Sequence, residues 1–223
     1  VGELYLEYHR GTYTTMARNK RFNRRAEFAC ENLELYATLA AGTGAYNYPA
    51  EALDECWKTL LRNQFHDILP GSGIYEIYED SRDEYEHILN ETDSLSSSAL
   101  EVLSERIAGT CGDVIVFNPN SKSTGSPVFL PKDECTMLQG NAGGFCMTDG
   151  EDDYPLQETA DGYFAVVDHI PSKGYRSFRL AEKKAAEEIP ADSLKITEEG
   201  AETPYFKVTW NEKGQFTGIY DKA

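Results

Sequence analysis

The chain has 223 residues and carries 21 Lys+Arg against 38 Asp+Glu, which gives a formal net charge of −17 at pH 7. This negative excess argues against a basic nucleic-acid groove or a polybasic membrane patch, because either needs a concentrated positive field. Hydrophobic residues make up 40% of the chain, enough for a packed core, and no apolar run approaches the roughly 20 residues of a membrane-spanning helix. We therefore expect neither nucleic acid nor a membrane as a partner.

Three helices separated by short breaks are predicted in the first half of the chain. Apolar residues recur at spacings of three and four after Asn19, which can cap the first helix. Pro49 opens the second helix, where its missing N–H costs nothing. The third helix is expected from about Ile74 to Ile107, with a serine-rich stretch at 94–98 where it could bend. The short breaks favour an antiparallel three-helix bundle.

From Gly109 onward the hydrophobic pattern alternates with a period of two, which is typical of strands. Strands are predicted at residues 114–117, 128–130, 163–167, 175–180, 206–210 and 215–220, the last two forming a hairpin. The Glu- and Lys-rich run 181–190 reads as a charged linker or an exposed edge. The predicted fold class is thus α+β and multidomain, an antiparallel three-helix bundle followed by a β-sandwich-like domain. The expected domain ranges are 1–18, 19–108 and 109–223.

The cysteines favour a reducing environment. There are five of them, an odd number, and none lies in a CxxC pair, so neither a disulfide scaffold nor a zinc knuckle is indicated. We expect free or buried thiols and a cytoplasmic protein. The chain begins at Val1 rather than Met, and we expect it to be a piece of a longer protein.

No complete catalytic set is present in the sequence. The acidic run 149–153 lacks the alternating ligand register and the closing Glu of a calcium loop. His66 and Asp67 stand where the second helix stops and the chain turns. A neutral imidazole can bind a metal, and a carboxylate can accept hydrogen bonds from sugar hydroxyls. From the spacing alone a helix-end cap or a packing role is favoured, because no other His or Asp group has ligand spacing.

Two segments nevertheless resemble a known family. Residues 64–72, Gln-Phe-His-Asp-Ile-Leu-Pro-Gly-Ser, closely resemble the late active-site motif of the glycoside hydrolase family 38 α-mannosidases in their bacterial form. Residues 2–15 resemble the segment that leads from the catalytic domain of that family into its helical middle domain. The downstream segments that resemble its β-rich C-terminal region are 116–119, 170–176 and 214–222.

The resemblance implies a retaining, zinc-dependent hydrolase of α-mannosides, acting on a mannose-containing oligosaccharide or glycan. His66 matches the last zinc ligand of the family and Asp67 a residue that binds substrate hydroxyls. His9 falls where relatives place a side chain, often aromatic, against the sugar. Gly73 stands where a second Ser is common in the family.

The same resemblance assigns the domains. Residues 1–18 would be the tail end of the catalytic domain and a linker, 19–108 the middle domain, and 109–223 a truncated start of the C-terminal region. The zinc-binding His-x-Asp pair, the nucleophile and the acid/base carboxyl all belong to sequence that would precede this chain. We therefore expect no catalytic residue here, no tight binding of Zn2+ by His66 alone, and no activity from the chain by itself.

A non-catalytic carbohydrate-binding or interaction module is the alternative. It predicts sugar binding without zinc, with Trp57 and Trp210 as sugar platforms, although core packing is favoured for both. Exposed bundle faces could also associate, so a homo-oligomer is compatible with the sequence.

Overall fold

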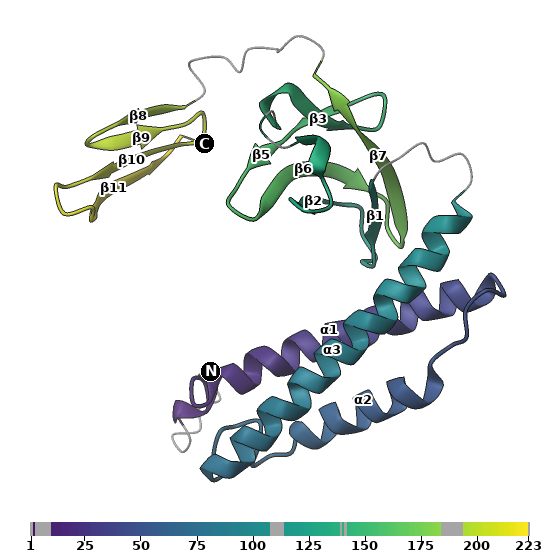
Figure 1. Ribbon diagram of the computed structural model, residues 1–223. Coiled ribbons are helices and arrows are strands. Elements are labelled where there is room, and N and C mark those ends of the chain that lie inside the picture. The colour runs from purple at the N-terminus through teal and green to yellow at the C-terminus, as the bar shows by residue number, and fades with distance from the viewer. Residues whose placement is uncertain are drawn as a thin grey trace.

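The computed structural model describes residue 2 and residues 10–107, 114–138, 140, 142–183 and 194–222. Within them, three helices are followed by antiparallel sheets, as Figure 1 shows. This architecture confirms the predicted fold class. The domain ranges stay a prediction, and His9 lies outside the described residues.

The helices agree closely with the predicted pattern. They are η1 Arg10–Tyr13, α1 Ala17–Gly42, α2 Ala50–Asn63 and α3 Tyr75–Arg106. The third helix is continuous through 94–98, so the predicted soft point does not interrupt it. Among the described residues, none of the helices combines the length and apolar composition needed to cross a membrane.

The predicted cap of the first helix is wrong. The residue that precedes α1 is Met16, which has a left-handed backbone (φ 50°) and makes no side-chain cap. Asn19 lies inside the first turn, and only 2% of it is exposed. Its amide oxygen is 2.9 Å from the hydroxyl of Ser81 on α3. A polar contact between helices therefore takes the place of the expected cap.

The three helices share one apolar core. Leu33 from α1, Leu60 from α2, and Tyr85 and Ile88 from α3 are fully buried in it, and the ring of Phe22 stacks on Tyr85 with centroids 5.8 Å apart. Each buried side chain of this size contributes roughly 1.5–3 kcal/mol relative to an exposed one. In Figure 1 the start of α1, the end of α2 and the start of α3 meet at one end of the bundle.

Two antiparallel sheets form a sandwich-like domain after the bundle. One has the strand order β1-β7-β3-β4 and the other β2-β6-β5. Both contribute to one core, with Leu130 and Val167 from the second sheet and Met147 and Phe178 from the first. The strands are β1 Val114–Asn118, β2 Thr124–Pro131, β3 Phe145–Thr148, β4 Asp153–Pro155, β5 Gln157–Glu158, β6 Gly162–Ile170 and β7 Gly174–Glu182, with the short helices η2 Thr136–Leu138 and η3 Ala142–Gly144 between β2 and β3.

A further sheet has the order β11-β10-β9-β8. Its strands are β8 Lys195–Thr197, β9 Gly200–Glu202, β10 Phe206–Trp210 and β11 Phe216–Asp221. The pairing of β10 with β11 confirms the predicted hairpin. Of the expected charged linker, 181–182 belong to β7, and 184–190 lie outside the described residues.

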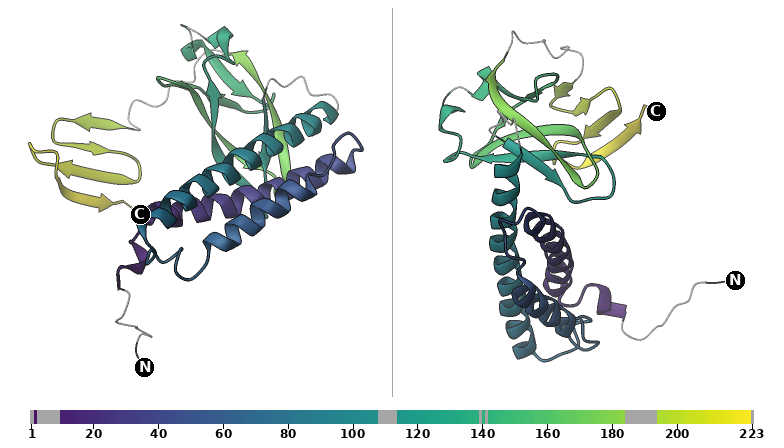
Figure 2. Two further views of the ribbon diagram at one scale, coloured as in Figure 1. Left: turned by 60° about the horizontal axis from the view of Figure 1, so that its bottom comes forward. Right: turned by 90° about the vertical axis from the view of Figure 1, so that its right-hand side faces the viewer.

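Aromatic rings join the bundle to the sandwich. The ring of Tyr36 on α1 meets that of Phe117 on β1 edge-on at 6.1 Å, and Phe117 also contacts Tyr175 on β7 at 5.8 Å. Leu100 and Leu103 of α3 pack against the same cluster. In Figures 1 and 2 these strands accordingly lie beside the C-terminal half of α3.

Candidate functional site

The candidate site is the segment between α2 and α3, residues 64–74, which we term the motif loop. It carries His66 and Asp67, whose side chains are 78% and 62% exposed. The His66 Nε2 and Asp67 Oδ2 atoms are 3.6 Å apart, beyond hydrogen-bond distance. The ring of Phe65 lies against the imidazole, with centroids 4.2 Å apart. Both functional groups therefore face solvent side by side.

Successive turns shape the backbone of the motif loop. The N–H of Phe65 donates to the Arg62 carbonyl at 3.1 Å, and the N–H of Ile68 donates to the Phe65 carbonyl at 2.9 Å. The N–H of Gly71 then donates to the Ile68 carbonyl at 3.1 Å. His66 and Asp67 are the two central residues of the turn closed by Phe65 and Ile68. Their side chains are exposed, but the backbone that carries them is hydrogen-bonded.

A polar network from α1 and α3 underlies the start of the loop. The Gln64 amide donates to Asn23 Oδ1 at 3.0 Å and to Glu27 Oε1 at 2.9 Å. The preceding residue, Asn63, is buried and donates to Glu84 Oε2 at 2.6 Å. Its amide oxygen is 2.5 Å from the Ser81 hydroxyl. The bonds to Glu27 and Glu84 have a carboxylate as acceptor and are stronger than the two bonds between neutral groups, so the end of α2 is firmly anchored to its neighbours.

The loop suits a metal as a source of one ligand. An exposed imidazole with a nitrogen open to solvent can bind zinc, but a zinc site needs three or four protein ligands. Among the described residues, no group of three or more His, Cys, Asp or Glu could hold a metal ion. His66 therefore fits a zinc ion only as one donor in a site completed by other residues.

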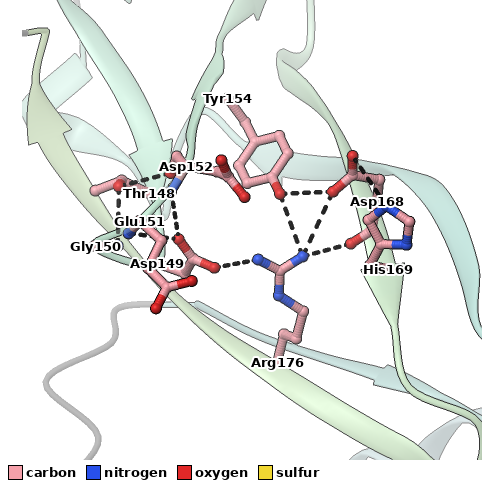
Figure 3. Close-up of polar contacts among 9 residues, drawn as sticks. All are labelled: Thr148, Asp149, Gly150, Glu151, Asp152, Tyr154, Asp168, His169 and Arg176. Carbon is pink, nitrogen blue, oxygen red and sulfur yellow. Dashed lines mark hydrogen bonds and ion pairs between the residues drawn. The ribbon is translucent and has the colours of Figure 1, made fainter.

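A second polar cluster lies in the sandwich, around Arg176 of β7 (Figure 3). Its guanidinium pairs with Asp149 in the turn between β3 and β4 and also contacts the Tyr154 hydroxyl and Asp168. Burial by itself raises the pKa of Asp149, but two backbone N–H groups of the turn and Arg176 outweigh it and lower the pKa. The Asp149 carboxylate is thus engaged by two backbone N–H groups of its own turn and by Arg176.

Sequence reasoning did not single out Arg176. The alternation of the strand placed it on one face of β7, whereas its partners come from the β3–β4 turn, β4 and β6. Strand pairing brings these residues together, and no local spacing signals it. The cluster is polar and largely satisfied, which is the behaviour of a structural network.

The two tryptophans are also engaged. The indole N–H of Trp57 donates to Glu34 Oε1 at 2.9 Å, and its ring packs against the bundle core. The indole N–H of Trp210 donates to the Glu198 carbonyl at 2.8 Å. Neither N–H remains available to a sugar in this arrangement.

The bundle and its motif loop match one protein family. The family model described as "Alpha mannosidase middle domain" matches residues 7–103. These residues belong to the α-mannosidase middle-domain family. His66 and Asp67 thus lie within an α-mannosidase middle domain, and the resemblance to glycoside hydrolase family 38 stated from the sequence is confirmed.

Curated relatives of this chain are much longer proteins. Alpha-mannosidase 2C1 of Mus musculus is 41% identical over 117 residues, which is 52% of this chain and 11% of that protein. Alpha-mannosidase of Saccharomyces cerevisiae is 44% identical over 80 residues, which is 35% of this chain and 7% of that protein. The chain therefore spans about a tenth or less of the length of these relatives.

Solved structures share the fold over nearly the whole chain. The crystal structure of a protein in glycosyl hydrolase family 38 from Enterococcus faecalis superposes with a TM-score of 0.66 and 22% identity. The superposition covers 95% of this chain and 30% of the Enterococcus faecalis protein. At this level of identity the likeness concerns the fold, and it extends beyond the bundle into the β-sheets.

Proposed function

We propose that this chain is the middle and early C-terminal part of a retaining, zinc-dependent α-mannosidase that hydrolyses mannose-containing oligosaccharides or glycans. The match of residues 7–103 to the α-mannosidase middle domain supports the enzyme class, as do curated relatives named α-mannosidases. The small share of those relatives that the chain spans supports its role as one part of a larger active enzyme.

The observation that carries the proposal is the exposure of His66 and Asp67 on an anchored backbone. In the proposed enzyme, His66 binds Zn2+ through a neutral imidazole nitrogen. Asp67 accepts hydrogen bonds from substrate hydroxyls through its carboxyl oxygens. His9 contributes a further contact to the sugar. These roles need side chains that point out of the bundle, and His66 and Asp67 do so.

Zinc, when bound, supplies a Lewis-acidic centre that can hold sugar hydroxyls. The residues of this chain would hold the metal and orient the substrate: His66 is one metal ligand, and the motif loop keeps Asp67 beside it. The carboxylate nucleophile and the acid/base carboxyl of a retaining mechanism belong, in this proposal, to sequence that precedes the chain. The chain alone is then inactive and binds zinc weakly.

The test is the hydrolysis of p-nitrophenyl α-mannoside by the longer polypeptide that includes the catalytic domain. His66→Ala should lower both bound zinc and kcat/KM by at least about 10-fold, the lower bound seen even for residues that only support a ligand. A chelator should inhibit the unmodified enzyme. His87→Ala is the matched control, because His87 is an exposed histidine on α3 and lies outside the motif loop. Unchanged zinc content and rate in His66→Ala would remove His66 from the site.

The stability of the same variant separates chemistry from folding. Because the His66 side chain is 78% exposed, its truncation should change the free energy of unfolding by no more than about 0.5 kcal/mol. The alternative of a non-catalytic carbohydrate-binding module predicts mannoside binding by this chain without zinc, which titration calorimetry would detect.

We also propose a cytoplasmic location. Cys30 and Cys56, both buried in the core of the helical bundle, are free thiols. Thiols of this kind are usual in a reducing compartment.

A further inference from the structure

The motif loop is held from outside its own sequence by two polar side chains, Lys20 of α1 and Tyr78 of α3. Neither residue touches His66, and the function proposed above assigns no role to either. Both bind backbone groups on the C-terminal side of His66, where the loop leaves its turn and runs toward α3. In Figure 1 the start of α1 and the start of α3 lie at the end of the bundle where this loop crosses between helices.

Lys20 joins the motif loop to the segment before α1. Its ammonium donates to the carbonyls of Leu69 at 3.0 Å and Pro70 at 3.4 Å, and to the carbonyl of Thr15 at 2.6 Å. An ammonium has three N–H donors, and here each has a carbonyl partner. Burial lowers the pKa of Lys20, as expected for an ammonium that is partly removed from water. Lys20 therefore links α1 to two other segments, the residues before α1 through Thr15 and the motif loop through Leu69 and Pro70.

Gly71 shows how closely these two segments approach. Its φ is +94°, and a Cβ added there would lie 2.7 Å from Thr15 Cγ2 and 2.9 Å from the Thr15 carbonyl oxygen. No side chain fits between them. The two segments that Lys20 links are thus in close contact at Gly71, and a larger residue there would force one of them to move.

Tyr78 holds the opposite side of the loop. Its side chain is almost completely buried, with 2% of the residue exposed. The hydroxyl accepts the N–H of Gly73 at 2.9 Å and lies 3.4 Å from the carbonyl of Asp67 and 3.3 Å from that of Ile68. The peptide unit that directly follows His66 and Asp67 therefore contacts a fixed hydroxyl in the bundle.

We propose that Lys20 and Tyr78 are positioning residues that fix the backbone of the motif loop so that His66 meets the metal at bonding distance. The inference rests on the function proposed above. Metal–ligand distances tolerate deviations of only about 0.2 Å, and groups that orient a ligand from behind typically change metal affinity by 10–100-fold when removed. His66 and Asp67 are exposed and gain little orientation from packing, so the backbone contacts of the loop carry that task.

The experiment measures the zinc dissociation constant of the longer, catalytically complete polypeptide by competition with a chromogenic chelator. Lys20→Met and Tyr78→Phe should each weaken zinc binding by about 10-fold or more. Lys20→Arg, which keeps a charged donor, should restore part of the affinity. Lys58→Met is the matched control, because Lys58 is an exposed lysine whose partners, Asp54 and Glu55, lie on its own helix. It should leave the zinc dissociation constant unchanged.

Two readouts distinguish positioning from general stability. The visible absorption of the cobalt-substituted protein should change in Lys20→Met and not in Lys58→Met, because that spectrum reports ligand geometry. Thermal melting identifies the folded fraction. If Lys20→Met does not fold, Tyr78→Phe decides, since it removes one hydroxyl and keeps the buried ring.

Each outcome has a distinct meaning. Folded Lys20→Met and Tyr78→Phe proteins with the zinc affinity and cobalt spectrum of the unmodified protein would overturn this inference and leave the proposed function standing. Zinc binding that survives His66→Ala, or an unmodified protein that binds no zinc, would refute the proposed function itself.

Discussion

Replacing Gly71 with alanine should destabilise the bundle more than the same replacement at Gly44. Both glycines have a left-handed backbone, with φ of +94° and +75°. They differ in surroundings: an added Cβ at Gly44 meets nothing within 4 Å, whereas at Gly71 it would collide with Thr15. The pair therefore separates the cost of backbone strain from the cost of the contact between the motif loop and the segment before α1.

The expected magnitudes follow from these two geometries. An L-residue in the left-handed region costs about 1–2 kcal/mol, partly offset by the lower entropy of the unfolded chain. Gly44→Ala should therefore lose about 1 kcal/mol. Gly71→Ala adds an overpacking cost of about 1–3 kcal/mol, because Thr15 is itself fixed by the hydrogen bond from its hydroxyl to the Gly11 carbonyl at 2.7 Å. The total should be about 2–4 kcal/mol.

The assay is urea denaturation of the 223-residue chain followed by far-UV circular dichroism, which reports the helices. For a unit of roughly 60–100 residues, such as the three-helix bundle, 1 kcal/mol shifts the melting temperature by about 4–8 °C, so the two variants should also separate clearly in thermal melts. Equal destabilisation by Gly44→Ala and Gly71→Ala would refute the reasoning. It would mean that the segment before α1 moves aside at no cost and does not constrain the motif loop.

Three further predictions concern the sandwich. Asn118→Ala should lower the free energy of unfolding, measured by chemical denaturation, by about 2–4 kcal/mol, because the buried amide lies within hydrogen-bond distance of three backbone carbonyls. A decrease of less than about 0.5 kcal/mol would contradict its structural role. Phe117→Ala should split calorimetric unfolding into separate bundle and sandwich transitions, and a single unchanged peak would argue against coupling through this ring. Because the folded-state pKa of Asp149 is lowered, its contribution to stability is present above about pH 5 and is lost as the pH falls toward that lowered pKa. Arg176→Met should therefore reduce the fall in melting temperature between pH 7 and pH 3. An unchanged dependence of melting temperature on pH would exclude the ion pair as its source.

Much of the fold could be predicted because its signals are local. The apolar stripes of α1 to α3 recur over many turns, and the strands β6 and β7 alternate over nine residues each. The short strands β4 and β5 escaped prediction, since two or three residues contain no measurable period. The cap assigned to Asn19 was wrong because a partner 62 positions away competes for its amide.

The candidate site divides in the same way. His66 and Asp67 belong to a contiguous motif, so nine neighbouring residues were enough to single them out, although their roles stay predictions. Lys20 and Tyr78 carry no such local signal. Lys20 reaches Leu69 across 49 positions of sequence, and that proximity exists only when α1 and α2 are packed side by side. The functional groups of the loop are side chains of adjacent residues, so the sequence alone reveals them. The rigidity of its backbone depends on hydrogen bonds from residues that only the packed bundle brings within reach.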